Sequence, residues 1–440
     1  MKTEKFEVGG PKATYVLIVC STLYMVNYMD RQVLSVVLEP MKIDLGLSDA
    51  QAGWIQTGFL LSMGLCSIPI SYFVDRWRRN GAIGVMAIVW SAATFCTGLG
   101  RSFIGVFIPR ILTGTGEAAF SSGAIALISA SYPPGVRAKK MGVYNMFLIF
   151  GVGLGMILGG YLSKNYGGWR TPFYVFAAPG VLLGILAFFM QDYPNPPRDS
   201  SIDKNPSFYE NAKKALKIPT MRWLFVGWGM HNLMSFAFLV WAPALIMRRF
   251  DVTEDVAGLV MAAAGALSVP GSLFGGTIAD AWQRKHPAGR MRFAAMADAV
   301  SSTAIIIALI FIFVLHQGSA ENISVWLVLG ILFYAVFTMG TIAGIPAVSA
   351  VTQDVVSTEL KGLAYGLSMF FMYLLGGGWS PALTGYLSDF FGGDARGLTY
   401  ALMITGASGY LGFVFWWISS KHYPADARKV NQLQPQDNFN

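Results

Sequence analysis

The sequence has few charged residues. Only 13% of its 440 residues are Asp, Glu, Lys or Arg, whereas roughly 25% are charged in an ordinary soluble domain. Hydrophobic residues make up 54%, and apolar runs recur from residue 13 to residue 419 with short polar breaks. A soluble domain of useful size therefore fits nowhere, and the composition indicates a polytopic membrane protein.

Cysteine and histidine are also scarce, which excludes several kinds of site. The three cysteines all lie inside apolar runs, so they form neither a disulfide framework nor a spaced metal site. The four histidines are scattered, and the chain contains no HExxH, no GxSxG and no Walker A sequence. We therefore expect no metal, no cofactor, no enzymatic activity and no nucleotide-driven pumping.

Long apolar runs are abundant. A membrane span needs about 20 mostly apolar residues. This rule predicts twelve spans, at residues 13–38, 50–74, 81–99, 104–130, 141–163, 171–190, 221–247, 256–281, 292–315, 324–350, 362–388 and 398–419.

The longest polar gap divides these spans into six and six. It opens with the proline-rich "QDYPNPPRDSS" and continues into "FYENAKKALK", which has the pattern of an amphipathic surface helix. We expect an all-α protein made of an N-terminal six-helix bundle (1–190), a cytoplasmic linker (191–220), a C-terminal six-helix bundle (221–420) and a cytoplasmic tail (421–440).

Basic residues are distributed unevenly between the two sides of the membrane. Of the 32 Lys and Arg residues, 23 lie on the side that carries both termini and 7 on the other, while Arg31 and Arg110 lie within spans. The positive-inside rule therefore places both termini in the cytoplasm. It also accounts for the net charge of +8 without a nucleic-acid partner.

The two halves of the chain repeat each other. "GYLSKNYGG" at 160–168 closes the fifth span, and "GYLSDFFGG" at 385–393 closes the eleventh. Similarly, "SYFVDRWRR" follows the second span and "GTIADAWQRK" follows the eighth. Parallel repeats that rock around a site at the membrane midplane are how one class of secondary transporter is built.

These motifs resemble those of the major facilitator superfamily along nearly the whole chain. The DRWRR sequence after span two, Asp75 to Arg79, is typical of that family, although Ser71 replaces its usual leading glycine. The fifth span is similar to the glycine pattern of antiporters, with Gly142, Gly151 and Gly155, but Met156 stands where proline is expected. The resemblance implies two pseudo-symmetric six-helix bundles and transport by alternating access.

Within the superfamily, three stretches are similar to the Spinster family of lysolipid and sphingolipid transporters: "NYMDR" in span one, "LSDAQAGWIQTGF" at 47–59 and "RILTGTGEAAFS" at 110–121. The same Asp–Arg and Arg–Glu placements occur in the anion:cation symporters that import sugar acids.

The resemblance implies a monomeric, proton-coupled secondary transporter in a bacterial-type inner membrane, surrounded by membrane lipids. Its substrate would be an anionic amphiphile such as a lysophospholipid or a sphingoid phosphate. A small organic anion such as a sugar acid is the alternative substrate. A membrane receptor without transport is the alternative of another class.

Four charged residues lie within predicted spans, where each costs about 2.5–3.5 kcal/mol on insertion scales. Asp30 and Arg31 are in span one, and Arg110 and Glu117 are in span four. Arg110 and Glu117 point to nearly the same face of their helix, about 10 Å apart. Charges retained at such a cost predict a functional site, unless they form a permanent network that fastens span one to span four.

The four residues suggest a mechanism in which proton and anion bind together. We predict that Asp30 and Glu117 couple transport to protons, and that Arg31 and Arg110 bind the substrate. When an acid is protonated, an arginine loses its internal counter-charge and can attract a carboxylate or phosphate.

Other polar residues are further candidates for substrate contacts. Asn27, Tyr28 and Asn145 lie in spans one and five, and His231 and Asn232 form a polar pair in span seven. The imidazole of His231 is either a second proton site or a histidine that is hydrogen-bonded between helices.

Charged residues at the cytoplasmic ends of helices are candidates for a gate. Asp75, Arg76 and Arg79 follow span two, and Asp280 occupies the related position after span eight. The positive-inside rule accounts for Arg79 but gives no reason for the carboxylate of Asp75.

Overall fold

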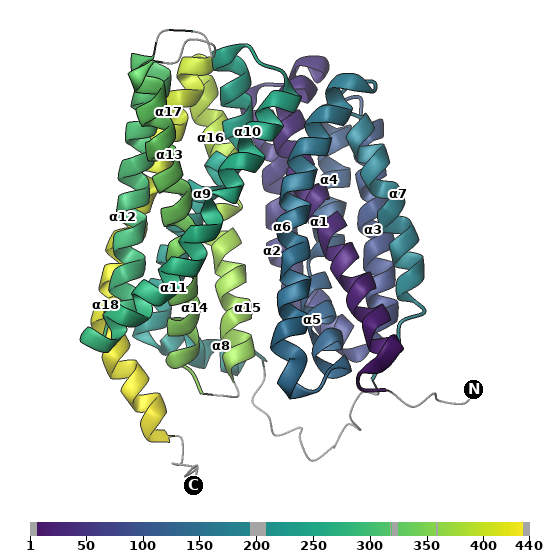
Figure 1. The fold of residues 1–440 in the computed structure, drawn as a ribbon, viewed down its shortest axis with the longest axis vertical. Helices are drawn as coiled ribbons and strands as arrows, with labels where there is room; N and C mark the ends of the chain where they lie inside the picture. The colour runs from purple at the N-terminus through teal and green to yellow at the C-terminus, as the bar shows by residue number, and fades with distance from the viewer. Residues whose placement is uncertain (1–6, 194–207, 317, 319–323, 358–359, 434–440) are drawn as a thin grey trace. The chain divides into compact units, whose positions relative to one another are not determined.

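A computed structural model describes residues 7–193, 208–316, 318, 324–357 and 360–433, and within these ranges every regular element is helical (Figure 1). Each of the twelve predicted spans coincides with a helix or an interrupted helix. Most of the predicted linker, residues 194–207, and the end of the predicted tail, 434–440, lie outside the described residues. The all-α fold class is confirmed.

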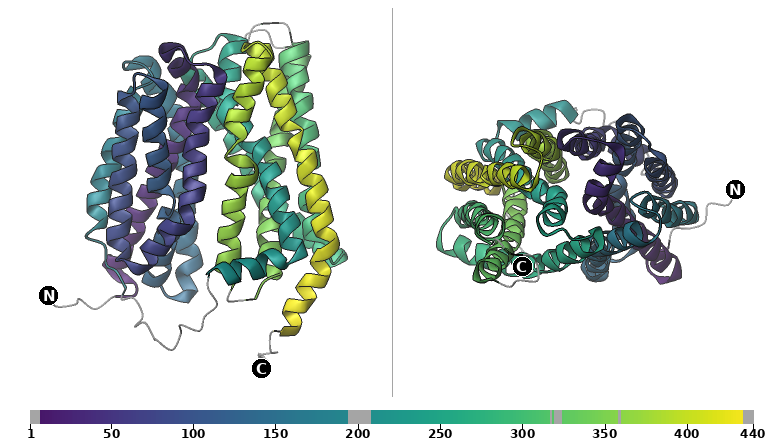
Figure 2. Two further views of the ribbon diagram at one scale, coloured as in Figure 1. Left: turned by 180° about the vertical axis from the view of Figure 1, so that it is seen from behind. Right: turned by 90° about the horizontal axis from the view of Figure 1, so that it is seen from above.

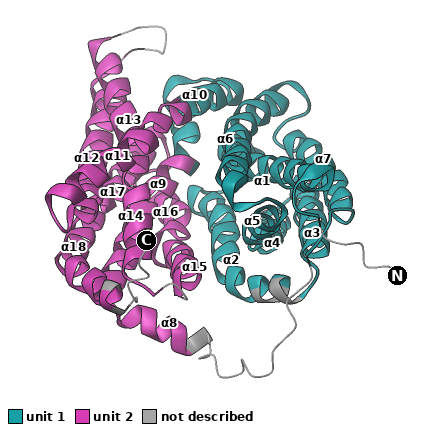
Figure 3. Ribbon diagram, turned by 60° about the horizontal axis from the view of Figure 1, so that its bottom comes forward, with its two compact units in different colours: residues 1–198, 240–263 teal, residues 199–239, 264–440 magenta. Residues whose placement is uncertain are grey.

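Contacts divide the chain into two compact units (Figure 3). Unit 1 comprises residues 1–198 and 240–263, and unit 2 comprises 199–239 and 264–440. The predicted bundle boundaries remain predictions. Unit 1 holds α1 (Gly10–Leu45), α2 (Asp49–Arg76), α3 (Arg79–Leu99), α4 (Phe103–Glu117), α5 (Phe120–Ser131), α6 (Pro134–Asn165) and α7 (Thr171–Ala187), together with the end of α9 (Pro219–Phe250) and most of α10 (Glu254–Ala266).

Unit 2 holds the start of α9 and the remaining helices. These are α8 (Phe208–Lys217), α11 (Ser268–Lys285), α12 (Gly289–Leu309), α13 (Val325–Ala343), α14 (Ile345–Asp354), α15 (Lys361–Met372), α16 (Ser380–Phe390), α17 (Ala395–Gly406) and α18 (Ser408–Leu433), with the π-helical segments η2 (Ile310–Leu315) and η4 (Tyr373–Gly377). Figure 2 shows that the long helices within each unit run side by side. The predicted amphipathic segment forms α8, which buries Ala215 in the core of the unit.

Nine helical stretches of the described chain are long and apolar enough to cross a membrane, and α7 is a shorter apolar helix. Several predicted spans are not single helices. Span four is divided into α4 and α5 immediately after Glu117, and span eleven is divided into α15, η4 and α16. The last helix is longer than predicted, because α18 continues to Leu433.

The repeated Gly–Gly pairs have the same backbone conformation in both halves. Gly167 and Gly168 have φ values of 100° and 85°, and Gly392 and Gly393 have φ values of 112° and 70°. The amide of the second glycine donates to a serine carbonyl at the preceding helix end, at 3.0 Å in α6 and 2.8 Å in α16. Only glycine adopts this left-handed conformation readily, which explains why both copies keep the pair.

The glycines of α6 allow close packing on α1. A Cβ atom at Gly151 would lie 2.5 Å from the carbonyl oxygen of Met25, and one at Gly155 would lie 2.7 Å from that of Met29. A larger residue at either position would push α6 away from α1. This contact fixes the helix that carries Asp30 and Arg31.

Candidate functional site

The structure brings the four predicted intramembrane charges together as two ion pairs between α1 and α4. Arg31 Nε donates to Glu117 Oε2 at 2.7 Å. Arg110 Nη1 donates to Asp30 Oδ1 at 3.5 Å. Each acid therefore has an arginine of the facing helix as its partner, and the net charge of the group is zero.

The Asp30–Arg110 pair is enclosed by the bundle. The Arg110 side chain is 0% exposed, and its guanidinium lies 4.6 Å from the centre of the Phe59 ring. Arg110 Nη2 also donates to Gln56 Oε1 at 3.5 Å. The hydroxyl of Thr94 on α3 donates to Asp30 Oδ2. This pair joins α1 to α2, α3 and α4, so it braces the bundle.

The Arg31–Glu117 pair has a different environment. The Arg31 side chain is 14% exposed, and its guanidinium lies 4.8 Å from the Tyr28 ring centre. Glu117 is buried, and its second oxygen, Oε1, has no hydrogen-bond partner among the described residues. The pair thus combines a partly exposed guanidinium with a buried carboxylate that has one oxygen without a hydrogen-bond partner among the described residues.

Two glycines next to Glu117 hold α4 in place. A Cβ atom at Gly114 would lie 2.3 Å from the carbonyl oxygen of Phe59 on α2, and one at Gly116 would lie 3.0 Å from the amide nitrogen of Trp90 on α3. The "TGTGEA" sequence therefore lets α4 approach both neighbours closely. This approach is what carries Glu117 into the interior of the bundle.

The other candidates of unit 1 are in different environments. Asn27 is fully buried on α1, and neither atom of its amide group has a hydrogen-bond partner in the described part of the chain. Tyr28 contacts Arg31 as described above. Asn145 on α6 is exposed, so the structure does not bring it into the buried network.

In unit 2, His231 is hydrogen-bonded between helices. Its Nδ1 lies 2.6 Å from Oδ1 of Asp298 on α12. Asn232 donates from its side chain to the carbonyl oxygen of Trp228 at 2.8 Å, within α9. Asp298 is absent from the residues predicted above, although it lies in predicted span nine. The insertion cost that singled out Asp30 applies equally to it.

The predicted gating residues lie at helix ends. Asp75 and Arg76 close α2, but their side chains are outside what the structure describes. Arg79 begins α3, where its amide donates to Asp192 Oδ2 at 2.7 Å and its guanidinium lies 4.0 Å from the Tyr193 ring centre. A gating role for these three residues remains a prediction.

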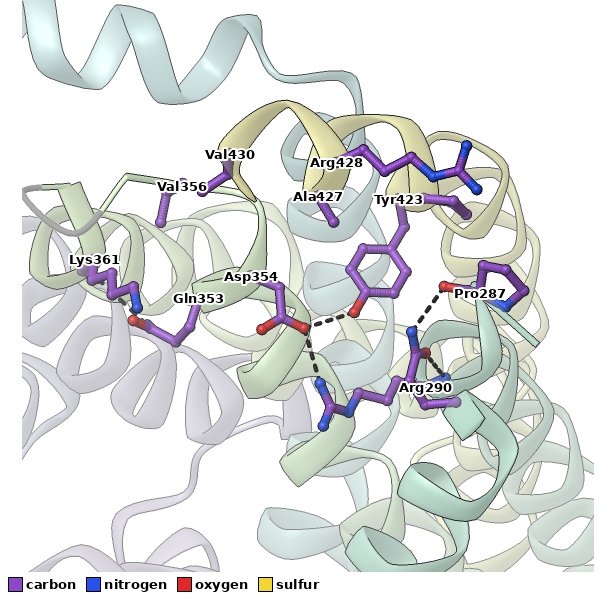
Figure 4. Close-up of a pocket in the computed structure, with 12 residues that line it drawn as sticks. Pro287, Arg290, Gln353, Asp354, Val356, Lys361, Tyr423, Ala427, Arg428 and Val430 are labelled. Atoms are coloured by element: carbon purple, nitrogen blue, oxygen red, sulfur yellow. Dashed lines mark hydrogen bonds and ion pairs between the residues drawn. The ribbon is translucent and has the colours of Figure 1, made fainter. Parts of the chain in front are cut away.

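Asp280 belongs to a polar network at one end of unit 2. Asp280 Oδ1 accepts from Arg290 Nε at 2.8 Å. Figure 4 shows the next link of this network, in which Arg290 Nη1 donates to Asp354 Oδ2 at 2.9 Å. The Tyr423 hydroxyl donates to the same Asp354 oxygen at 2.6 Å. These residues join α11, α12, α14 and α18 beside a pocket of about 380 Å³.

A further ion cluster in unit 1 was not predicted. Arg248, near the end of α9, donates to both oxygens of Asp49 at 2.7 and 2.6 Å and to Glu39 Oε2 at 2.6 Å. Lys42 Nζ also lies 2.7 Å from Asp49. Each of these residues by itself resembles an ordinary charge beside a short loop. The contact between α9 and the α1–α2 turn therefore could not be predicted from the sequence.

The fold and the site define a multi-pass α-helical membrane protein with a buried, charge-paired centre. A family model described as the Major Facilitator Superfamily matches residues 20–381. The chain belongs to this superfamily, and it is therefore a membrane transporter of that type. Proteins of this kind carry small-molecule substrates and are generally not enzymes.

Named relatives cover most of the chain. An "MFS-type efflux pump" of Mycolicibacterium smegmatis is 26% identical, over 96% of both chains. "Protein spinster homolog 3" of Danio rerio is 25% identical, over 93% of this chain and 85% of the relative. A "Hexuronate transporter" of Bacillus subtilis is 25% identical, over 83% and 85%. The predicted similarities to Spinster proteins and to transporters of sugar acids are confirmed.

A solved structure shows the same fold. It is a bacterial homolog of the human lysosomal transporter Spinster, crystallised in an inward-facing, unoccupied conformation. The TM-score is 0.77 at 22% identity, over 97% of this chain and all of that one. The likeness confirms the predicted major facilitator fold.

Proposed function

We propose that this chain is a proton-coupled secondary transporter of an anionic amphiphile such as a lysophospholipid or a sphingoid phosphate. We place it as a monomer in a bacterial-type inner membrane, with both termini in the cytoplasm. The observation that carries the proposal is the Arg31–Glu117 pair. An accessible guanidinium is held there by a buried carboxylate that has one oxygen without a partner.

The pair supplies a physical link between proton and anion. While Glu117 is charged, its oxygen accepts from Arg31 and neutralises the guanidinium. A proton on Glu117 removes this counter-charge, and Arg31 then attracts a carboxylate or phosphate group of the substrate. Release of the anion restores the ion pair and favours release of the proton. Each ligand therefore strengthens the binding of the other.

The alternative substrate is a small organic anion such as a sugar acid. The similarity to the B. subtilis hexuronate transporter supports it. Both substrate classes require an arginine, because both carry an anionic group. A lipid tail additionally requires an apolar groove, so a comparison of matched ligands separates the two possibilities.

Arg31→Ala should weaken binding of the anionic substrate about 10- to 100-fold, since a charge-assisted hydrogen bond is worth about 1.5–3 kcal/mol. Arg31→Lys should restore little, because an ammonium is a point charge rather than a fork. Binding is measured as ligand-induced thermal stabilisation of the purified protein, with a lysophospholipid, the same lipid without its charged headgroup, and a hexuronate.

Arg101→Ala, at an exposed arginine in the α3–α4 loop, is the matched control for this test. Stabilisation by the lysophospholipid, but not by the neutral lipid or the hexuronate, supports the main proposal. Stabilisation by hexuronate alone supports the alternative. Equal affinities in Arg31→Ala and Arg101→Ala would exclude Arg31 from the site.

We further propose that the Arg248–Asp49–Glu39 cluster forms and breaks during the transport cycle. Asp49 and Glu39 are both buried, so the contact is strong while it lasts. Arg248→Ala should raise amide hydrogen exchange in residues 39–49 and slow transport several-fold. Arg249→Ala, one residue further on, is the control. Exchange and transport that are the same in both variants would show that the cluster is not a gate.

A further inference from the structure

A second buried pair of titratable groups lies in unit 2, remote in sequence from the charges of α1 and α4. His231 Nδ1 is 2.6 Å from Asp298 Oδ1, and the two side chains are 3% and 1% exposed. Asp298 Oδ2 has no hydrogen-bond partner among the described residues. It is aimed at Gly412 on α18, where a Cβ atom would lie only 2.2 Å from it. Glycine at this position leaves room for the carboxylate.

The imidazole ring lies between two indoles. The Trp228 ring is stacked on it with centroids 5.4 Å apart and an interplanar angle of 7°, and the Trp416 ring lies at 5.4 Å and 27°. Trp416 is fixed by a hydrogen bond from its Nε1 to the carbonyl oxygen of Leu224 at 3.2 Å. Aromatic faces carry negative potential and attract a cation, so this sandwich favours the imidazolium over the neutral ring.

The second ring nitrogen also has a suitable neighbour. The Ser235 hydroxyl donates to the carbonyl oxygen of His231 at 3.0 Å, and its oxygen lies 3.5 Å from His231 Nε2. Because the serine proton is already used, a lone pair of that oxygen is available to an N–H group at Nε2. Both ring nitrogens therefore face acceptors, as an imidazolium requires.

We propose that His231 and Asp298 form a second proton-binding site, separate from the Glu117 site. In the unloaded state a neutral imidazole donates from Nδ1 to the aspartate, and the pair carries one negative charge. One proton from water adds at Nε2, and the pair becomes a neutral imidazolium–carboxylate. That the pair binds a proton is inferred from this geometry alone. That the proton is used in transport rests on the proposed function.

The described helices that contact the pair carry no other charged residue within one helical turn of it. The helices that contact it are α9, α12 and α18, and their nearest charged residues, Arg222, Arg292 and Lys421, each lie more than one turn away along the helix. The protonation state of the pair is therefore set by the two groups themselves, the indoles and Ser235.

The stacked indoles provide a direct readout, because a protonated imidazole quenches the fluorescence of a tryptophan in contact with it. Purified protein in detergent, without substrate, is titrated from about pH 9 to about pH 5, which brackets the ordinary range of histidine. We expect a step of decreasing tryptophan fluorescence that is lost in His231→Gln. Asp298→Asn, which lacks the counter-charge, should move the midpoint down by about 1–3 pH units.

Three variants keep the test decisive. His316→Gln, at the other buried histidine, should retain the step, as should Glu117→Gln, because the site is independent of the proposed coupling residue. Trp416→Phe keeps the pair and removes one reporter, so the step should shrink even if His231→Gln does not fold. A wild type without a step, or a step that is unchanged in both His231→Gln and Trp416→Phe, would overturn the proposal.

Discussion

Glu117→Gln is expected to abolish substrate accumulation driven by a pH gradient while substrate exchange continues. The amide has the shape of a protonated carboxyl group and cannot release a proton, so the site stays in its anion-binding form. Arg31 loses the negative charge that is paired with it at 2.7 Å. In proteoliposomes, gradient-driven uptake should fall to the level of vesicles without protein. Exchange of labelled for unlabelled substrate should remain within a few-fold of wild type.

The comparison requires a second acid that is not part of the ion-pair network. Glu210→Gln, at an exposed residue of α8, should leave both assays unchanged. Gradient-driven uptake of wild-type size in Glu117→Gln would remove Glu117 from proton coupling, and Asp30 would be the next candidate. Loss of uptake and exchange together would indicate a folding or binding defect, which the thermal-shift assay with substrate would reveal.

Arg110→Gln is expected to destabilise the protein by about 3–5 kcal/mol, the cost of leaving one partner of a buried ion pair alone. The Arg110 side chain is 0% exposed, so water cannot replace its contact with Asp30. The double variant Asp30→Asn/Arg110→Gln should recover a large part of this loss, because it removes both charges. The free energy of unfolding is measured by titration with a denaturing detergent.

A double-mutant cycle separates bracing from substrate binding. Asp30→Asn alone leaves Arg110 unpaired and should also destabilise the protein. If the two single changes add in the double variant, the residues do not interact and the Asp30–Arg110 pair is not the brace described above. A strong loss of ligand affinity without any loss of stability would instead place Arg110 in the binding site.

Much of the fold follows from the sequence because hydropathy is a strong signal in membranes. Each backbone polar group of a span must be satisfied within its own helix, so long apolar runs become helices. The interruptions after Glu117 and at Tyr373–Gly377 were not predicted. Helix breaks of this kind depend on contacts with neighbouring helices, which a count of apolar residues does not contain.

The four charges of α1 and α4 could be predicted because a charge in a span is costly and therefore rare. Which acid pairs with which arginine could not be predicted. Asp30 and Arg31 are adjacent, and which of them meets Arg110 and which meets Glu117 depends on side-chain conformations and on the close approach of α4 at Gly114 and Gly116. From the sequence, Arg31 and Arg110 therefore have equal roles, whereas in the structure Arg31 is partly exposed and Arg110 is enclosed.

The partners of His231 and Arg248 are distant in sequence. Asp298 lies on α12, and Asp49 and Glu39 lie at the α1–α2 turn, so no local spacing connects either set. Asp298 is a charge within a predicted span, so its insertion cost marks it as a candidate, but the sequence does not show its partner. Arg248 is not marked in this way, because a basic residue near a helix end is ordinary in a membrane protein.

The most direct test of proton-coupled anion transport is the proton movement that accompanies substrate movement. Sealed proteoliposomes that enclose a pH-sensitive dye, with equal pH on both sides, receive the substrate identified by the stabilisation assay. We predict a change of internal pH that begins with substrate entry in the wild type and is absent in Glu117→Gln. Substrate entry without any change of internal pH in the wild type would contradict the account.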